Sequence, residues 1–269
     1  MSSINLKLIE KFKGVNNLEI IENQSDVKRL SKDFYNYSPV LTEKLDGCIA
    51  DLVVRPCDHK AVMKVAEICW ELSIPITLRG SGTGNYGQAV PLFKGVIMQM
   101  SRFNNLEDFD PDTGFVKVQS GCVMGDLNKQ LEKYGRELRL LPSTWRTATI
   151  GGFIAGGSGG IGSIRWGFLR DPGNLIGLEA VTINEKPEFL KFDAEESEPL
   201  NHAYGTNGII TSLLLGILLI INEIYKKKEN FQNMYWRLSG CGNPCIGRIS
   251  RGPAWCVGRV YGGWRLVTK

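Results

Sequence analysis

A glycine-rich segment after a short apolar run is the first place where residue types and spacing could do chemistry. It reads Arg79-Gly-Ser-Gly-Thr-Gly-Asn-Tyr-Gly87. Closely spaced glycines let a backbone approach an anion and turn its N–H groups inward, while Ser81 and Thr83 add hydroxyl donors. This chemistry is that of a phosphate cradle.

Three other interpretations of this segment must be weighed. A P-loop requires Gly-Lys-Ser/Thr at its end, which is absent here. Gly82, Gly84 and Gly87 match the spacing of a dinucleotide fingerprint, but that motif must open a helix and residues 88–95 do not look helical. A glycine-rich turn without a ligand stays open, so the segment indicates an anion site without establishing one.

A second glycine-rich segment runs from Pro142 to Gly167. It has eight glycines within residues 151–167 and few charges, which makes it too apolar for a flexible linker. A backbone without side chains suits a wall packed closely along a large, flat ligand. Together the two segments predict one extended ligand.

Few other side chains offer chemistry. His59 starts a predicted helix and is expected to face solvent, and for His202 a position away from the ligand is favoured over one beside it. Cys241, Cys245 and Cys256 lack a fourth ligand of matching spacing, so no metal site is predicted. No catalytic residue can be assigned, because nothing resembles a Ser/His/Asp triad.

The elements that must position these segments follow from the hydrophobic pattern. Apolar runs at 50–54, 75–78 and 95–100 predict strands, and a helical stripe over 58–72 connects the first two as in a parallel βαβ unit. Beyond Ser101 the pattern changes to strands joined by turns, with one helix. The strands predicted there cover 106–109, 115–120, 175–183, 188–192 and 208–219, and the helix covers 124–134. This order predicts an α+β fold.

Composition limits the remaining choices. The chain has 269 residues, 31 Gly, 7 Cys and a net charge of +4, which gives no case for nucleic-acid binding. An odd, irregular cysteine set and an N-terminus without a signal or transit pattern predict a cytoplasmic location. The apolar run over 209–221 is shorter than the roughly 20 residues that cross a bilayer, so we expect a buried strand or a peripheral membrane contact and no transmembrane span.

The charge is unevenly distributed along the chain. Residues 223–269 contain nine basic and two acidic residues, so the net charge of +4 leaves residues 1–222 slightly acidic. Residues 231–269 contain no Asp or Glu at all. Natural domains interleave both signs of charge, so this tail differs in character from what precedes it, as a truncation or a shifted reading frame would produce.

The order of these features resembles a known family. Residues 49–219 resemble the FAD-binding domain of the vanillyl-alcohol oxidase and p-cresol methylhydroxylase (PCMH) type, and are similar to the FAD subunits of glycolate oxidase and D-lactate dehydrogenase. Each matching element is weak alone, and their number and order carry the resemblance. In chain order they are Val53-Val-Arg-Pro56, Pro75-Ile-Thr-Leu-Arg-Gly-Ser-Gly82, Gly95-Val-Ile-Met98, Val118-Gln-Ser-Gly121, Ala148-Thr-Ile-Gly-Gly152, Trp166-Gly-Phe168, Asp171, Leu178-Glu-Ala-Val181 and Gly208-Ile-Ile-Thr211.

The resemblance implies a PCMH-type fold of two α+β subdomains with FAD extended between them. It implies that the first segment holds the pyrophosphate through backbone N–H groups and that the second flanks the isoalloxazine and ribityl chain. Thr83 stands where some family members bear a histidine bonded to FAD, so noncovalent FAD is expected. The cofactor-binding residues implied in this way are Arg79, Gly80, Ser81, Gly82, Thr83, Gly84, Asn85, Pro142, Thr147, Thr149, Gly151, Gly152, Ala155, Gly159, Ser163, Ile209 and Ile210.

The resemblance also implies a function. It is that of an FAD-dependent oxidoreductase that oxidises a 2-hydroxy acid of the glycolate or D-lactate type by hydride transfer to flavin N5, with a redox partner subunit. The cap domain that follows the flavin domain in this family is not recognisable, so the alternative is a truncated, catalytically incomplete FAD-binding module. The expected organisation is a helical lead-in over 1–45, the FAD-binding domain over 46–222, with subdomains of about 46–105 and 106–222, and a tail of non-family character over 223–269.

Overall fold

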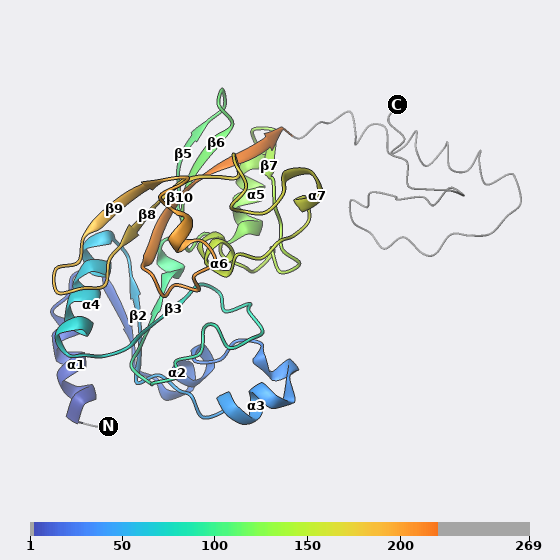
Figure 1. Cartoon of the computed structure of the whole chain (residues 1–269). Coiled ribbons are helices and arrows are strands. Elements are labelled where there is room, and N and C mark those ends of the chain that lie inside the picture. Colours follow the sequence, from blue (N-terminus) through green and yellow to red (C-terminus); the bar gives the residue numbers. More distant parts are fainter. Residues whose placement is uncertain (1–2, 220–269) are drawn as a thin grey trace, which may run out of the picture. The chain divides into compact units, whose positions relative to one another are not determined.

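The computed structural model describes residues 3–219 (Figure 1). The predicted tail over 223–269, with its three cysteines, lies outside the described residues. In the described part, strands from residues 18–99 form one sheet and strands from residues 106–219 form another. Helices pack against both sheets. The α+β fold predicted from the sequence is confirmed.

The first sheet has the strand order β1-β2-β4-β3. Its members are β1 (Leu18–Ile21), β2 (Leu52–Pro56), β3 (Ile76–Arg79) and β4 (Val96–Gln99). β4 pairs in parallel with both β2 and β3, whereas β1 pairs antiparallel with β2. The crossover from β2 to β3 through helix α4 (His59–Glu71) therefore passes over one strand position. The carboxyl ends of three parallel strands meet at one edge of this sheet.

Helix α4 follows directly from its sequence. Asp58 is the N-cap, and its Oδ1 accepts a hydrogen bond of 2.7 Å from Ala61 N. Val62 and Val65, one turn apart on the inner face, are fully buried. The helix ends before Ser73, which has the left-handed φ of +52°. The predicted helix over 58–72 is confirmed.

Helices cover both faces of the first sheet. α1 (Ser3–Lys13) and α4 lie on one face, where Phe12 and Leu52 belong to the same core cluster. α2 (Gln24–Leu30) lies on the other face and packs through Val27 against Val53 and Ile97. Neighbouring residues of β2 thus enter different cores, as expected for a parallel strand buried on both sides.

The sequence predicts a helical lead-in over 1–45. The structure corrects this, because the lead-in also contains the strand β1. Asn17, with a left-handed φ of +57°, turns the chain into this strand, and Leu18 then pairs with Pro56. A strand of four residues leaves almost no periodicity to detect, which is why the sequence does not reveal it. The lead-in continues through the 3-10 turn η1 (Tyr35–Tyr37) and α3 (Pro39–Leu45).

The second sheet has the order β5-β6-β10-β8-β9, with β7 pairing with a further stretch of β10. All these pairings are antiparallel. The strands are β5 (Leu106–Asp110), β6 (Phe115–Gln119), β7 (Arg136–Leu138), β8 (Leu175–Val181), β9 (Phe189–Asp193) and β10 (Ile209–Leu219). The five strands predicted in this part of the chain are confirmed. The structure adds β7, which the sequence does not predict because its three residues are too few to show a pattern.

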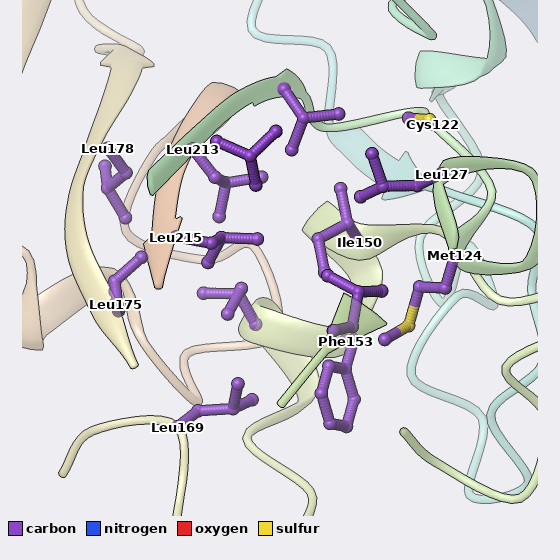
Figure 2. Packing of buried hydrophobic residues seen from close by; sticks show 14 of the residues in the cluster. Cys122, Met124, Leu127, Ile150, Phe153, Leu169, Leu175, Leu178, Leu213 and Leu215 are labelled. Carbon is purple, nitrogen blue, oxygen red and sulfur yellow. The ribbon is translucent and has the colours of Figure 1, made fainter. Parts of the chain in front are cut away.

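One face of the second sheet is the larger core of the protein. Figure 2 shows Leu213 and Leu215 of β10 opposite Ile150 and Phe153 of α6 (Ile150–Gly156). α5 (Met124–Glu132) contributes Leu127 to the same cluster. The apolar face of this sheet thereby positions α6, which belongs to the second glycine-rich segment.

The opposite face of the second sheet is polar. Lys117 Nζ on β6 lies 3.2 Å from Glu107 on the neighbouring β5 and 2.9 Å from Glu179 on β8, which is on the other side of β10. An antiparallel sheet that alternates apolar and charged residues buries one face and leaves the other toward solvent.

The apolar run that begins at Ile209 is the central strand of the second sheet. It forms β10 and pairs with β6, β7 and β8. The expectation of a buried strand is confirmed over 209–219, and residues 220–221 lie outside the described part. No helix within residues 3–219 combines the length and apolarity that crossing a membrane requires.

Candidate functional site

A cleft of about 790 Å³ opens where the carboxyl end of β3 approaches α6. Pockets for small molecules and cofactors measure roughly 300–1,000 Å³. Segments far apart in the sequence form its walls: the loop after β3, residues 142–159 around α6, the loop before β10, and part of the lead-in. The carboxyl ends of parallel strands are where ligands bind in open α/β sheets.

The two glycine-rich segments touch each other in this cleft. A Cβ at Gly80 would overlap Oγ1 of Thr149, so a side chain at this position would push the loop away from α6. Thr149 is the N-cap of α6, and its Oγ1 accepts a hydrogen bond of 3.4 Å from Gly152 N. The loop after β3 and the start of α6 therefore form one continuous wall, as a single extended ligand requires.

Arg79 lies beneath the first glycine-rich loop. Its side chain is buried, with only 7% of the residue exposed, and Nη2 donates to Ser81 O at 3.5 Å. Nε and Nη1 are buried and have no hydrogen-bond partner among the described residues. Burial lowers the pKa of this guanidinium, and the nearby charge of Asp33 opposes that shift. Two donors of a buried cation thus lie without a partner among the described residues, directly beneath the loop that lines the cleft.

Asp33 brings the lead-in into the site. The residue is 8% exposed, and its Oδ1 accepts a hydrogen bond of 2.9 Å from Tyr35 N. Burial raises the pKa of its carboxyl, while the backbone N–H groups of Tyr35 and the 87–89 segment and the charge of Arg79 counteract this. Phe34 N donates to Gly84 O at 2.8 Å. The lead-in is therefore bound directly to the glycine-rich loop.

The start of α6 is held against the strand that precedes α5. Gly151 N donates to Ser120 O at 2.8 Å, and a Cβ at Gly151 would come within 2.5 Å of the Ser120 Cβ. Ser120 Oγ is buried at the cleft and has no partner among residues 3–219. The sequence predicts a glycine-lined wall here, and the structure builds that wall as a short helix packed on its neighbour.

The end of α6 carries two aromatic residues from the loop before β10. His202 N donates to Ile154 O at 3.1 Å and Tyr204 N donates to Ala155 O at 2.8 Å. Both side chains line the cleft. The sequence favours a position away from the ligand for His202. The structure places its side chain at the cleft, because backbone hydrogen bonds to α6, which no sequence pattern encodes, hold the loop against the wall.

The structure brings most of the sequence-predicted site residues together. All of them line the cleft except Ser163 and Ile209. Ser163 begins α7 (Ser163–Trp166), where its Oγ accepts a hydrogen bond of 3.0 Å from Gly160 N. Ile209 is fully buried in the core under the first sheet, whereas Ile210, on the opposite side of β10, lines the cleft.

Sequence reasoning missed a set of residues that form the rest of the wall. They come from segments without glycine motifs, and their only signal is the aromatic or polar residue type itself. They include Asp33, Phe34, Tyr37, Met100, Ser120, His202 and Tyr204.

His59 is not the solvent-facing residue that the sequence predicts. Its ring packs edge-on against Phe103 and Phe189, with centroids 5.3 and 4.7 Å away, and Nε2 is buried. The first turn of α4 faces the connection between the two sheets, which explains the burial. Within residues 3–219, no group of three or more His, Cys, Asp or Glu residues could hold a metal ion.

Comparison with known proteins places this geometry in context. The FAD binding domain family matches residues 50–187. A D-lactate dehydrogenase from Anaerostipes hadrus is 27% identical over 221 residues, which are 79% of this chain and 44% of that protein. Glycolate oxidase subunit GlcD from Escherichia coli (strain K12) is 31% identical over 146 residues, which are 54% of this chain and 29% of that protein. The chain therefore spans less than half the length of these relatives.

A solved structure shares the fold. An alkyldihydroxyacetonephosphate synthase superposes with a TM-score of 0.69 and 18% identity, covering 87% of this chain and 50% of that chain. At this identity the likeness concerns the fold alone, and it agrees with the PCMH-type fold that the sequence predicts. The family match covers about half of the chain and contains both glycine-rich segments that meet in the cleft. The chain thus belongs to the FAD binding domain family, and FAD is its cofactor, as the sequence predicts.

Proposed function

We propose that FAD lies noncovalently in the cleft and that the chain is the flavin domain of an oxidoreductase acting on a 2-hydroxy acid. The observation that carries this proposal is the buried guanidinium of Arg79, with Nε and Nη1 lacking partners among the described residues. A pyrophosphate supplies two negative charges and several acceptor oxygens, which such donors bind strongly. The backbone N–H groups of Gly80–Gly84 and Asn85 would complete this anion site.

The second wall fits the planar part of the cofactor. Gly151, Gly152, Ala155 and Gly159 place almost no side-chain atoms at the cleft. Such a surface allows a flat ring to approach the backbone closely. We assign the isoalloxazine and ribityl chain to this wall, together with Pro142, Thr147 and Thr149. Thr83, in the loop, offers no imidazole for a covalent bond, which supports noncovalent attachment.

The proposed reaction uses the chemistry of the cofactor and the positioning power of the chain. Bound FAD supplies flavin N5 as the acceptor for the hydride that leaves C2 of the 2-hydroxy acid. The residues of the two walls would hold and orient the cofactor. The names of the relatives, D-lactate dehydrogenase and glycolate oxidase subunit GlcD, support this substrate class. We also propose a partner subunit, since GlcD is named as a subunit.

A second candidate is an FAD-binding module without turnover of its own. The observation that favours it is coverage: the chain spans 44% and 29% of the two relatives. The parts of those proteins without a counterpart here are long enough to contain much of a substrate pocket. We assign no catalytic residue, and the two candidates differ in whether the bound flavin is reduced by substrate.

The proposed boundary between the two subdomains falls between the last strand of the first sheet and the first strand of the second. We propose an FAD-binding domain over 46–222, with subdomains of about 46–105 and 106–222, preceded by the lead-in and followed by the tail over 223–269. We also propose a cytoplasmic location, which is supported by the free state of Cys48, Cys57, Cys69 and Cys122.

The test is the flavin spectrum of the purified chain. Glycolate, D-lactate and D-2-hydroxyglutarate are added separately without oxygen, and the protein is then precipitated with acid. A yellow protein that one of these acids bleaches supports the oxidoreductase, and a yellow protein inert to all three supports the module. Flavin that stays on the acid precipitate contradicts noncovalent attachment. A folded, colourless protein that fails to bind added FAD contradicts the proposed site.

A further inference from the structure

His202 and Tyr204 form a side-chain pair at the cleft that the family match does not contain. Their ring centroids are 5.3 Å apart at an angle of 68°, and His202 Nε2 lies 3.0 Å from the Tyr204 hydroxyl, at hydrogen-bonding distance. Both residues line the cleft, and both lie beyond residues 50–187, which the family match covers. Neither glycine-rich segment nor the proposed pyrophosphate site uses them.

The pair is fixed at the carboxyl end of α6. The backbone N–H groups of both residues donate to the carbonyls of Ile154 and Ala155 in the last turn of the helix, where carbonyls lack i+4 partners, and Ile154 O also accepts from the C-cap Gly157 N. Gly157 ends α6 with a left-handed φ of +59°, and a Cβ at this position would overlap the His202 ring. The absence of a side chain at Gly157 therefore creates the space that the imidazole fills.

The backbone of both residues is strained. His202 has a φ of +61° and Tyr204 has a φ of +52°. Such angles are uncommon for residues other than glycine; asparagine, aspartate and histidine adopt them more often than the rest, and tyrosine does not share that preference. Strained residues of this kind concentrate at ligand sites, where the surrounding structure maintains them. In this loop the strain has a visible result, since it directs two rings into one wall of the cleft.

We propose that Tyr204 stacks on a planar ring of the bound dinucleotide, either adenine or isoalloxazine, and that His202 positions the Tyr204 ring through its hydrogen bond. Tyr204 is 44% exposed, so a large part of the ring is available to a ligand in the cleft. Stacked or edge-on aromatic pairs stabilise a complex beyond the area that they bury. This inference rests on the proposed function, because it requires FAD in the cleft.

The experiment measures the dissociation constants of FAD, FMN and ADP for the apoprotein of the full chain. Tyr204→Asn removes the ring and keeps a residue that tolerates a left-handed backbone, so the variant is expected to fold. Tyr204→Phe keeps the ring without the hydroxyl. The matched control is Tyr134→Asn, since Tyr134 is 60% exposed and packs against Phe109 away from the cleft. Thermal unfolding of each apoprotein confirms folding.

The expected result is that Tyr204→Asn weakens FAD binding about 3- to 10-fold, while Tyr134→Asn changes it less than twofold. Tyr204→Phe and His202→Asn both remove the hydrogen bond between the two side chains, so they should give similar losses, each smaller than that of Tyr204→Asn. If Tyr204→Asn weakens the binding of ADP as much as that of FAD and leaves FMN binding unchanged, the stacked ring is adenine. If it weakens FMN binding and leaves ADP binding unchanged, the stacked ring is isoalloxazine. Either pattern supports the inference.

Other outcomes overturn the inference. Unchanged FAD affinity in Tyr204→Asn excludes stacking, and an equal loss in Tyr204→Phe assigns the effect to the hydroxyl instead. A loss in His202→Asn without a loss in Tyr204→Asn also contradicts it. In each of these cases the wild-type protein still binds FAD, so the proposed function stands. Absence of FAD binding by the wild-type protein would overturn the proposed function itself, and the inference with it.

Discussion

The guanidinium of Arg79 lies so close beneath the backbone of Gly82 that a Cβ on Gly82 would overlap it. The loop therefore lies directly on a buried positive charge, and no described residue forms a hydrogen bond with its Nε or Nη1. Position 82 needs a glycine because any side chain there would overlap the guanidinium. The backbone passes directly over the cation, so an anion bound by the loop N–H groups would lie close to its positive charge.

Gly82→Ala should therefore abolish tight FAD binding. The added methyl group collides with Arg79 and the φ of +71° is strained for alanine, at a cost of about 1 kcal/mol or more in the free energy of unfolding. Gly135→Ala is the matched control, because Gly135 has a φ of +66° with no atom within 4 Å of a Cβ. FAD titration of both variants separates the collision from the strain. Equal FAD affinities in the two variants would contradict this explanation.

Replacement of Arg79 tests the charge itself. Arg79→Met should weaken FAD binding about 10- to 100-fold, since hydrogen bonds from charged donors contribute about 1.5–3 kcal/mol each. The FAD affinity of Arg79→Lys should lie between those of the wild type and Arg79→Met, because lysine keeps the charge and loses the forked donor geometry. Arg170→Met, at an exposed ion pair of 3.7 Å with Glu198, serves as control. An affinity for FAD in Arg79→Met equal to that of the wild type would remove Arg79 from the site.

Asp33 should make the stability of the apoprotein depend on pH. Burial raises the pKa of its carboxyl above the ordinary 3.8, so the folded state keeps the proton to higher pH than the unfolded chain does. The stability that this group contributes is full below 3.8 and is lost as the pH rises through the folded pKa. Asp33→Asn should therefore raise the free energy of unfolding, relative to wild type, more at about pH 7 than at about pH 4.

The free energy of unfolding of these variants is measured by urea unfolding at each pH, and Asp110 provides a control of opposite sign. A hydrogen bond with the Thr113 side chain lowers the pKa of this exposed carboxyl. Its contribution is present above the ordinary pKa and is lost as the pH falls through the lowered one. Asp110→Asn should thus lower stability near neutral pH and have no effect in acid. A difference between Asp33→Asn and wild type that does not vary with pH would contradict the assignment for Asp33.

Thiol reactivity should follow burial. Burial raises the pKa of the Cys69 thiol to about 12 and that of the Cys122 thiol to about 11, so almost none of either is thiolate near neutral pH. Cys57 is exposed. In peptide-resolved alkylation with iodoacetamide, Cys57 should react first among the four cysteines within residues 3–219, and Cys69 and Cys122 should react only after denaturation. Fast labelling of Cys122 in the folded protein would show that the region before α5 opens.

The sequence predicts the elements that have strong local patterns. Helix α4 has both a capping aspartate and an apolar stripe, and β10 is an uninterrupted apolar run, so each could be placed within a few residues. β1 and β7 could not, because strands of three or four residues are specified by the partner they pair with rather than by their own periodicity. The glycine-rich segments could be predicted as ligand-binding for a different reason, since a backbone almost without side chains allows a ligand to approach it closely.

The remaining part of the site depends on tertiary structure. Asp33 and Arg79 are far apart in the sequence, and their proximity results from the hydrogen bond that joins the lead-in to the loop at Gly84. His202 and Tyr204 enter the cleft because their N–H groups satisfy the end of α6. Ile209 and Ile210 could not be told apart without the register of β10, which decides which neighbour faces the cleft. Local residue patterns predict none of these contacts.

The central position of β10 has a consequence for how the protein forms during synthesis. β10 is the last described strand, and it lies between β6 and β8, which are made earlier. The first sheet uses only residues 18–99 and can complete its pairing while the ribosome is still translating the rest. The second sheet must wait with open strand edges until residues 209–219 emerge. Its closure, and with it the wall that Ile210 contributes, is a late, long-range event and the slow step that we expect in folding.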